Sequence, residues 1–353
     1  MRKMQEHVVK GNNIFIGLED SKKTWKLCAR CERLIVDEAS MPAEFDVLRT
    51  YLKNKFPECA ITILYEAGFQ GFWLHDLLAE EGYTCIVTPA NKVTQAKDER
   101  VKTDKRDARR LARNLENGDY VACHVPCHVR REDRQISRTL DQIIKDIKAT
   151  KNRIRRFLDY HGLNGGLKTG AWCDKDYRVL KSLDLPHSLK VSLDASLQLL
   201  ESQFAIRNAL MKELQVLSTS DRYCDSVRIK MSSPGIGWLT AIRLTLEWGD
   251  LRRFPTGKHI ASFTGLTSRE YSTGDTVRRG RITGQSAEQV RSWLIECAWR
   301  AIRKDPVLLT KYRAVKNNSG SPKKAIVAVA RKLAVRLWTL ETSGQFYEVG
   351  IVA

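Results

Sequence analysis

The chain has 353 residues, of which 42% are hydrophobic and 29% are charged. This composition excludes a largely disordered protein and allows a sizeable folded core. No apolar run approaches the ~18 residues of a membrane-spanning helix, and the N-terminus lacks the apolar core of a signal peptide. We therefore expect a cytoplasmic protein, or a nuclear one if the host has a nucleus.

The net charge is strongly positive, at +19, because 60 lysine and arginine residues outnumber 41 aspartate and glutamate residues. Such an excess attracts polyanions by Coulomb forces and by the release of their counterions. Nucleic acid is the polyanion that we expect as a partner. A basic, solvated surface without a partner is the alternative.

The nine cysteines are scattered along the chain. Residues three apart on a strand, such as Cys28 and Cys31, point to opposite faces and do not easily share a metal ion. We therefore expect free thiols rather than disulfides or a zinc site.

Residues 10–125 have the alternating pattern of an α/β domain. Apolar and β-branched runs predict five strands, and helical spacing of apolar residues predicts a helix after the third, fourth and fifth strands. The order is therefore β-β-β-α-β-α-β-α, and the last helix ends at Gly118. The expected strands are residues 13–19, 24–30, 33–39, 60–66 and 83–89, and the helical segments begin at Pro42, Phe72 and Lys102.

Residues 130–220 are expected to form long helices. Apolar side chains from Ile136 to Leu158 keep mostly to one helical face, and those from Leu193 to Leu214 repeat close to a heptad. We interpret this segment as a helical coiled-coil linker. It is either an antiparallel hairpin within one chain or an oligomerising coiled coil.

Residues 225–345 are expected to form a mainly helical domain. The segment SSPGIGWLTA resembles a helix-hairpin-helix turn, in which Gly235 and Gly237 let backbone amides approach a phosphate at a helix N-terminus. A turn that only packs two helices is the alternative. A polar, basic loop is expected at residues 268–284, and a buried helix follows in SPKKAIVAVARKLAVRLW. The basic residues expected to contact phosphates along its edge are Lys323, Lys324, Arg331, Lys332 and Arg336.

Carboxylates are predicted to gather at one end of the N-terminal sheet. Glu19 and Asp20 end the first strand, and Glu66 ends the fourth. Asp104 and Asp107 lie on the last helix, and their spacing places both on one helical face. In this element order the first strand is central, the fourth pairs beside it and the last helix packs across the same end. We therefore expect these side chains to lie within a few ångströms of one another.

Such a cluster of carboxylates repels itself unless a cation neutralises it. Mg²⁺ and Mn²⁺ prefer oxygen ligands, so we predict a Mg²⁺ (or Mn²⁺) site at these acids. Two such ions ~3.5–4 Å apart stabilise the attacking and leaving oxygens of a phosphodiester displacement. Solvated carboxylates without a metal are the alternative. The basic residues that surround these acids in the sequence are Lys97, Arg100, Lys102, Lys105, Arg106, Arg109 and Arg110. This mixture suits a metal site that faces a DNA or RNA backbone, and Lys102, Lys105, Arg106 and Arg109 are the expected contacts to it.

This domain resembles the RuvC-like branch of the RNase H fold, with its DEDD set of acidic residues. The segment KTDKRDARRLA is similar to a signature of one transposase family in that branch. That family is the bridge-RNA-guided insertion-sequence recombinases, which also include the Piv DNA invertases. The resemblance implies an RNase H-like N-terminal domain with Mg²⁺ as its cofactor. The catalytic and metal-binding acids that it implies are Glu19 or Asp20 with Glu66, Asp104 and Asp107.

The family pattern at the first strand is Gly-hydrophobic-Asp, and Gly17-Leu18-Glu19 aligns with it. Glu19 therefore stands where relatives have Asp, and Asp20 follows immediately. Because Phe15, Gly17 and Glu19 share one face of a strand, we favour Glu19 as the first metal ligand. Asp20 replaces it if the strand bulges. Gly17 is expected to leave space beside Glu19 for an ion and a phosphate.

The resemblance continues in YSTGDTVRRGRITG, near the C-terminus. The family carries Tyr-Ser-(Ser/Thr)-Gly there, followed by an Arg, a Gly and an Ile-Thr/Ser pair. The resemblance makes Ser272 the nucleophile that attacks a DNA phosphate and holds a covalent intermediate, and it makes Arg278 and Arg279 contacts to DNA. The chain departs from the family at Gly284 and Ser286, where relatives have Lys and Gly.

The resemblance covers nearly the whole chain and implies a DNA transposase or recombinase. It also implies a dimer or tetramer that works with a structured noncoding guide RNA pairing with donor and target DNA. A bacterial or archaeal cytoplasm, with association to the nucleoid, is the expected location. One alternative is a metal-dependent RuvC-like nuclease of the junction-resolvase type, in which water attacks instead of Ser272. Another is an inactive nucleic-acid-binding relative, and an RNase H-fold kinase is a more distant one.

Overall fold

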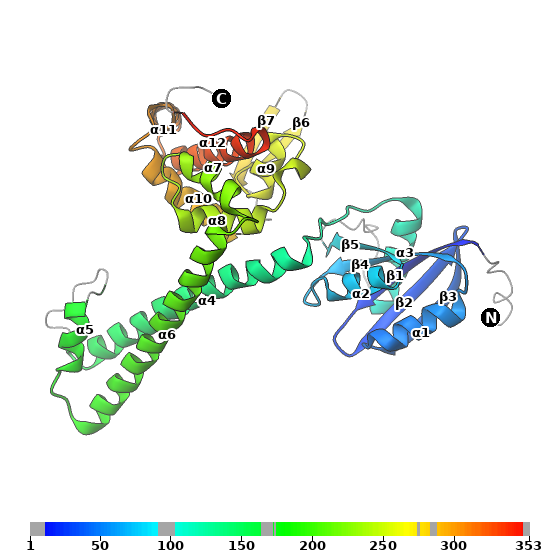
Figure 1. Ribbon diagram of the computed structural model, residues 1–353, viewed down its shortest axis with the longest axis horizontal. Helices are drawn as coiled ribbons and strands as arrows, with labels where there is room; N and C mark the ends of the chain where they lie inside the picture. Colours follow the sequence, from blue (N-terminus) through cyan, green and yellow to red (C-terminus); the bar gives the residue numbers. More distant parts are fainter. Residues whose placement is uncertain are drawn as a thin grey trace. The chain divides into compact units, whose positions relative to one another are not determined.

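The computed structural model describes residues 11–90, 103–163, 172, 174–273, 276–282 and 288–348. The chain divides into two compact units, residues 1–125 and 126–353, and each has its own hydrophobic core. The first unit is a mixed α/β domain and the second is mostly helical (Figure 1), as the sequence predicts. The domain limits 10–125, 130–220 and 225–345 stay predictions.

A five-stranded sheet with the order β3-β2-β1-β4-β5 forms the first unit, and β1 is its centre. β1 pairs antiparallel with β2 and parallel with β4, in agreement with an RNase H-like domain. The strands are β1 (Asn13–Asp20), β2 (Thr24–Cys31), β3 (Leu34–Pro42), β4 (Ala60–Ala67) and β5 (Thr84–Pro89). The helices are α1 (Phe45–Lys55), α2 (Trp73–Glu80) and α3 (Asp104–Asn117), so the element order is the predicted one.

The two faces of this sheet are covered by different helices. Ile14, Ile16 and Leu18 of β1 are fully buried in a core that they share with α1 and α2. α3 packs across β1 and β2 on the opposite face. Because side chains alternate along a strand, the residues between these three, and Glu19 after them, point toward α3.

α3 lies so close to β1 that position 17 has no room for a side chain. A Cβ on Gly17 would be 2.2 Å from the carbonyl oxygen of Ala108 and 2.3 Å from the amide nitrogen of Ala112. Cys28 of β2 is buried with the same two alanines. Our expectation that Gly17 leaves space for an ion is therefore wrong, because the backbone of α3 fills that space.

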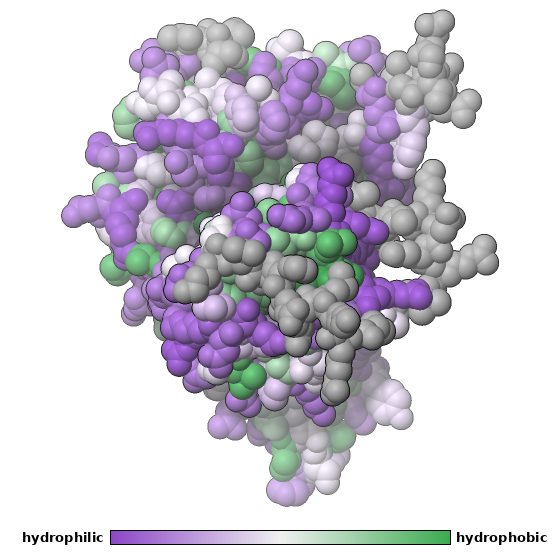
Figure 2. All heavy atoms as spheres, turned by 90° about the vertical axis from the view of Figure 1, so that its right-hand side faces the viewer, coloured by the Kyte–Doolittle hydropathy of each residue, from purple (hydrophilic) through white to green (hydrophobic). Residues whose placement is uncertain are grey.

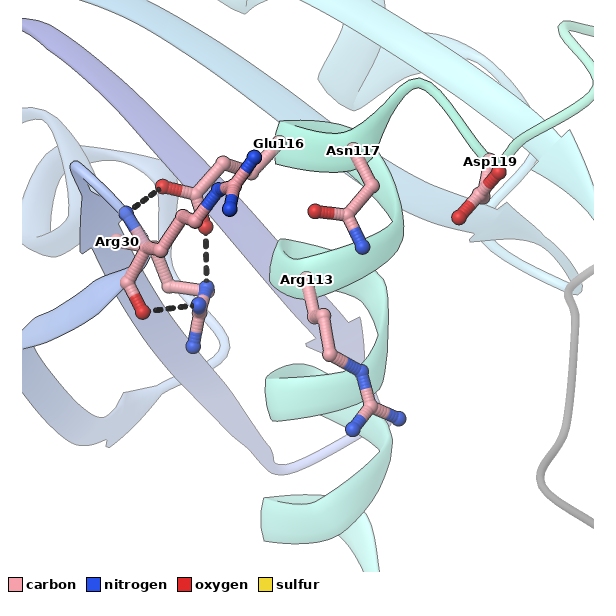
Figure 3. A pocket seen from close by; sticks show the side chains of 6 residues that line it. Arg30, Arg113, Glu116, Asn117 and Asp119 are labelled. Atoms are coloured by element: carbon pink, nitrogen blue, oxygen red, sulfur yellow. Dashed lines mark hydrogen bonds and ion pairs between the residues drawn. The ribbon is translucent and has the colours of Figure 1, made fainter.

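The C-terminal end of α3 is fastened to the β2–β3 turn by Glu116 (Figure 3). The carboxylate of Glu116 accepts hydrogen bonds from Nε of Arg30 at 2.6 Å and from the backbone amide of Arg33 at 2.5 Å. These residues line a cavity of about 620 Å³ together with Arg113, Asn117 and Asp119. This end of α3 therefore anchors the helix, whereas the predicted acids lie at its other end.

Two helices of 33 residues, α4 (His128–Tyr160) and α6 (His187–Thr219), begin the second unit. They pack along each other, and α5 (Asp174–Lys181) lies between them in the sequence (Figure 1). Ile154 of α4 and Leu197 of α6 are nearly fully buried in their shared core. This pairing is the intramolecular alternative for the predicted linker, and an oligomerising coiled coil stays a prediction.

The remainder of the second unit is a helical domain around one large core. Its helices are α7 (Cys224–Ser232), α8 (Trp238–Trp248), η2 (Leu251–Arg253), α9 (Gly257–Phe263), α10 (Glu288–Ala301), α11 (Pro306–Ser319) and α12 (Pro322–Ser343). Ile242, Leu294 and Leu333 bring α8, α10 and α12 together in this core. The segment expected to be a basic loop forms a hairpin of β6 (Ser268–Thr273) and β7 (Thr276–Ile282).

One face of the molecule is strongly polar. The face drawn in Figure 2 is mostly hydrophilic, with hydrophobic residues in small separate groups, in keeping with the many lysines and arginines of the sequence. Among the described residues, no helix combines the length and the apolar character needed to span a membrane.

Replacing Gly17 by alanine tests the close packing of α3 on β1. The added methyl group would overlap two backbone atoms, so we expect the free energy of unfolding to fall by about 3 kcal/mol. Gly68→Ala is the matched control, because its Cβ would be 3.9 Å from the nearest atom. The control should change stability by less than ~0.5 kcal/mol. Urea unfolding followed by circular dichroism measures both, and equal effects would contradict this role of Gly17.

Candidate active site

Glu19 and Glu66 end two neighbouring strands on the face that α3 covers. Leu18 pairs with Tyr65 in the parallel register of β1 and β4, so the two glutamates follow at adjacent positions. Leu64, two residues before Glu66, packs against α3, and alternation along β4 puts Glu66 on that face too. Both glutamates are partly buried.

The first turn of α3 brings two more carboxylates to this place. Thr103 caps the helix, because its hydroxyl accepts the amide of Arg106 at 3.4 Å, and helical geometry begins at Asp104. Asp107 is buried, with 3% of its surface exposed, whereas Asp104 is exposed. Carboxylates at a helix N-terminus interact favourably with the helix dipole, which helps this turn to carry two of them.

Burial and the mutual repulsion of these carboxylates raise the pKa of Glu19. Burial raises the pKa of Glu19 to about 7, together with the negative charges of Glu66, Asp107, Asp20 and Asp104. All the predicted acids therefore lie near enough to act on this one group. A carboxyl group with this pKa is partly protonated at neutral pH, and a bound cation would favour its ionised form.

Asp20, the neighbour of Glu19 in the sequence, has a different environment. Alternation places it with Leu18 on the face that packs against α1 and α2. Asp20 is 7% exposed, and its Oδ2 is buried without a hydrogen-bond partner among the described residues. Burial raises the pKa of Asp20 to about 6, with a smaller contribution from the charge of Glu66 that is opposed by a backbone hydrogen bond. Of the two, Glu19 shares the face of Glu66 and Asp107.

Arg110, three residues after Asp107 on α3, joins two of the carboxylates. Its Nη1 is 2.9 Å from Oδ1 of Asp107, and its Nη2 is 3.0 Å from Oε1 of Glu66. The Arg110 side chain is 6% exposed. Arg110 is therefore a buried partner of the acids that it was expected to surround. Its spacing from Asp107 on the buried face of the helix is the signal that could have shown this.

The donor set suits a hard divalent cation such as Mg²⁺ or Mn²⁺. Every predicted ligand is a carboxylate, Oδ2 of Asp20 is an unpartnered buried acceptor, and Glu19 is kept partly protonated by burial and by its neighbours. Among the described residues, no three His, Cys, Asp or Glu side chains are grouped closely enough to hold an ion as they stand. Arg110 holds two of the carboxylates, Glu66 and Asp107, in ion pairs.

The basic residues predicted to face nucleic acid have varied surroundings. Lys105 and Arg109 are exposed on α3, and both pair with Glu38 of β3, at 3.1 Å for Nζ of Lys105 and 2.8 Å for Nη2 of Arg109. The hydrogen bond from Arg109 is the main cause that lowers the pKa of Glu38. Arg106 is exposed between them in the sequence. Lys97, Arg100 and Lys102 lie outside the described part of the chain.

Ser272 lies near the end of β6 in the second unit. Its backbone pairs with that of Val277 on β7, and Arg278 and Arg279 follow on the same strand. The side chains of Ser272, Arg278 and Arg279 lie outside the described residues. The predicted nucleophile and the two arginines are therefore on adjacent strands of one hairpin.

Gly235 and Gly237 have different roles in the turn before α8. Gly235 has a φ of +92°, and a Cβ on it would be 2.7 Å from the carbonyl oxygen of Cys297 and 2.8 Å from the amide nitrogen of Ala301. It lets the turn pack tightly on α10, as the packing alternative requires. Gly237 is the N-cap of α8, and no atom lies within 4 Å of its Cβ position. A phosphate contact at this helix N-terminus stays a prediction.

The basic residues of α12 divide into an exposed and a buried group. Lys323 and Lys324 are exposed in its first turn. Arg336 is 7% exposed and lies 2.5 Å from Oδ2 of Asp305, which also accepts the hydroxyl of Tyr347 at 2.8 Å. The expected phosphate contact at Arg336 is therefore wrong, because this arginine neutralises a buried carboxylate.

Two protein-family models match the chain. One, described as a transposase with the DEDD domain of IS110, matches residues 17–162. The other, described as the transposase IS116/IS110/IS902 family, matches residues 227–313. The first match contains the carboxylate cluster, and the second contains Ser272.

Several curated proteins are similar over much of the chain. The putative transposase y4qE of Sinorhizobium fredii is 27% identical over 67% of this chain, although the match spans only 57% of that relative. The putative transposase y4rJ of the same organism is 27% identical over 96% of this chain and 94% of its own length. The transposase for insertion sequence element IS1533 of Leptospira borgpetersenii is 24% identical over 92% of this chain and 94% of its own. The chain belongs to the IS110/IS116/IS902 family of insertion-sequence transposases and carries the DEDD domain of that family.

Proposed function

We propose that the protein cuts and rejoins DNA as the transposase of an insertion sequence, with Ser272 as the nucleophile and a divalent cation at the carboxylate cluster. The observation that carries this proposal is the gathering of Glu19, Glu66 and Asp107 at the N-terminal turn of α3, where their charges act on one another. Family membership supports DNA as the substrate.

Glu19, Glu66 and Asp107 are the proposed ligands of Mg²⁺ or Mn²⁺, with Asp104 at the exposed side of the cluster. Asp20 is the less favoured alternative to Glu19, because it is on the opposite face of β1. When bound, the cation supplies positive charge that stabilises a phosphate under attack. In its absence, Arg110 orients Glu66 and Asp107 through its two ion pairs.

The Ser272 hydroxyl is proposed to attack the phosphorus of a DNA phosphodiester. A bond from phosphorus to the serine oxygen forms while the bond from phosphorus to the leaving sugar oxygen breaks. The serine proton passes to a base, and the leaving oxygen takes up a proton. The covalent intermediate is itself a phosphodiester, so rejoining needs no further co-reactant. Arg278 and Arg279, on the strand that pairs with β6, are proposed to hold the DNA backbone.

The proposed partners are donor and target DNA and a structured noncoding RNA that pairs with both. The net charge of +19 supports polyanionic partners of this kind. A dimer or tetramer, acting at the nucleoid of a bacterial or archaeal cell, completes the proposal.

Two separate variants, Ser272→Ala and Glu66→Gln, test the proposed chemistry. In cells that carry the element with its flanking DNA, we expect each variant to lower recombination by about 10³-fold or more, because each removes a group that acts on the phosphate. The purified Ser272→Ala protein should also form no covalent adduct with DNA on a denaturing gel. Ser268→Ala, at the start of the same hairpin, is the matched control and should keep both activities.

The outcomes separate the proposed chemistry from its alternatives. Continued cation-dependent DNA cleavage by Ser272→Ala would assign water as the nucleophile and make the protein a nuclease. Full recombination by Glu66→Gln would remove the carboxylate cluster from the mechanism.

Cation binding should depend on pH because Glu19 loses a proton when an ion binds. The pKa of Glu19 is raised to about 7. Below that pH the carboxyl group is mostly protonated and must lose its proton for the cation to bind, whereas above that pH it is already ionised. We expect the Mn²⁺ affinity to rise about tenfold from pH 6 to pH 8 and then to level off. Calorimetry in buffers of different ionisation enthalpy measures both affinity and proton release. Glu19→Gln should abolish the dependence near pH 7 and Asp20→Asn should keep it, whereas the reverse would assign Asp20 as the ligand.

Arg110 should compete with the cation for Glu66 and Asp107. Arg110→Met removes both ion pairs, so we expect the Mn²⁺ dissociation constant to fall about tenfold, equivalent to ~1.4 kcal/mol. Without Mn²⁺ the same variant should melt at a lower temperature, because it leaves two carboxylates without a partner. Arg113→Met is the control, since it removes an exposed arginine from the same helix. An unchanged or weaker Mn²⁺ affinity in Arg110→Met would contradict competition.

A further inference from the structure

A second cavity, of about 340 Å³, lies in the second unit beside the start of α4. Its lining includes Arg130 of α4, Arg222 just before α7, Arg252 of η2 and Glu341 of α12. Three arginines at one cavity indicate an anion as the ligand, provided that acidic side chains do not already neutralise them.

The first turn of α4 adds positive charge to this cavity. It contains His128, Arg130 and Arg131 and no acidic residue, and its N-cap Cys127 makes no side-chain hydrogen bond. Helix N-termini carry a partial positive charge that acidic side chains or bound anions usually compensate. Glu132, just beyond the turn, pairs with His128 at 3.3 Å. Arg130 therefore adds to the charge of the helix end instead of balancing it.

The guanidinium of Arg130 lies against Gly249, and both residues line the cavity. A Cβ on Gly249 would be 2.8 Å from Nη1 of Arg130, so the two residues are in direct contact. Gly249 has a φ of +68° and a ψ of −146°, a conformation that essentially only glycine adopts. Nε of Arg130 is buried and has no hydrogen-bond partner in the part of the chain that the structure describes. A buried donor without an acceptor is unfavourable unless a ligand supplies one.

The carboxylates at this cavity are already engaged. Glu341 accepts a hydrogen bond from Ser226 at 2.7 Å and another from Lys230, which is fully buried. Asp250 accepts the backbone amide of Arg252 at 2.9 Å. Among the contacts of the described residues, neither carboxylate forms an ion pair with Arg130.

The remaining charges leave an excess of cations. Arg222 lies 3.2 Å from Asp133, so its charge is balanced, whereas Arg252 is exposed at the cavity. Burial lowers the pKa of both Lys230 and Arg253, and the charge of Arg130 lowers each further. The cations around Arg130 therefore repel one another, and an anion in the cavity would relieve this repulsion.

We propose that this cavity binds one phosphate group of the DNA backbone through Arg130 and Arg252. Guanidinium groups match phosphate oxygens with paired hydrogen bonds, and both Arg130 and Arg252 line the cavity. The positive end of α4 favours the same charge. The choice of DNA as the source of the phosphate rests on the proposed function, whereas the anion site itself does not.

Inorganic phosphate tests the anion site in the full-length protein. At constant ionic strength, replacing chloride by phosphate should raise the melting temperature of the wild type, because the ligand binds only the folded state. Arg130→Met should abolish the shift, and Arg313→Met, which removes an exposed arginine from α11, should keep it. No shift in the wild type, or an equal shift in Arg130→Met, overturns the anion site.

DNA binding over a range of salt concentrations then tests the source of the phosphate. Loss of one phosphate contact lowers the slope of log affinity against log salt by about 0.9. Arg130→Met should show this loss for duplex DNA. Arg252→Met should show the same loss, and it changes an exposed side chain outside the hydrophobic core. An unchanged slope in both variants, or a change confined to RNA of the same length, overturns DNA as the ligand.

A separate measurement distinguishes this site from the carboxylate cluster. Both variants should bind Mn²⁺ with wild-type affinity, because neither residue belongs to the cluster. Loss of the phosphate effect with Mn²⁺ binding intact is the expected result. If the wild type shows no phosphate effect but Ser272→Ala still loses recombination, the cavity proposal fails and the proposed function stands.

Discussion

The backbone of α3 lies directly on the central strand of the sheet, and the carboxylate cluster depends on this contact. Only a hydrogen at Gly17 lets the backbone of Ala108 and Ala112 come so close. Asp107 precedes Ala108 on the helix, and Glu19 follows Gly17 on the strand by two residues. The contact between the helix and the strand therefore also sets the distance between Asp107 and Glu19. Glu116 fastens the other end of α3 to the β2–β3 turn. The helix is therefore held at both ends, and its first turn cannot move away from the acids without opening the core.

Charge balance is the second constraint on the molecule, and the protein meets it with arginine and lysine. Arg110 pairs with two acids of the cluster. In the second unit, Arg336 pairs with the buried Asp305, and the buried Lys230 pairs with Glu341. Burying such charges is favourable only when each has a partner of opposite sign. The cluster differs from the other two pairs because further carboxylates surround it and raise the pKa of Glu19. This surplus of negative charge is what a divalent cation would neutralise.

Much of the first unit could be predicted because its signals are local. Apolar and β-branched runs predict the strands, Gly118 predicts the end of α3, and alternation along the first strand places Glu19 on the face of Gly17. The errors and the omissions concern contacts between distant segments. Arg110 meets Glu66 44 residues away, and Arg336 meets Asp305 31 residues away. A lone arginine on a basic helix looks the same in the sequence whether it faces solvent or a buried acid, so pattern alone could not separate them.

The sequence by itself determined the α/β class of the first unit, the helical character of the second, the positions of the acids along the chain and the resemblance to a transposase family. These properties depend on residue type and on spacing along one segment. Only the tertiary structure decided that α3 fills the space at Gly17, that Arg110 and Arg336 are buried partners of carboxylates, and that Arg130 lies in a cavity against Gly249. Each of these depends on which backbone or charge the fold brings from elsewhere, and no local pattern records that.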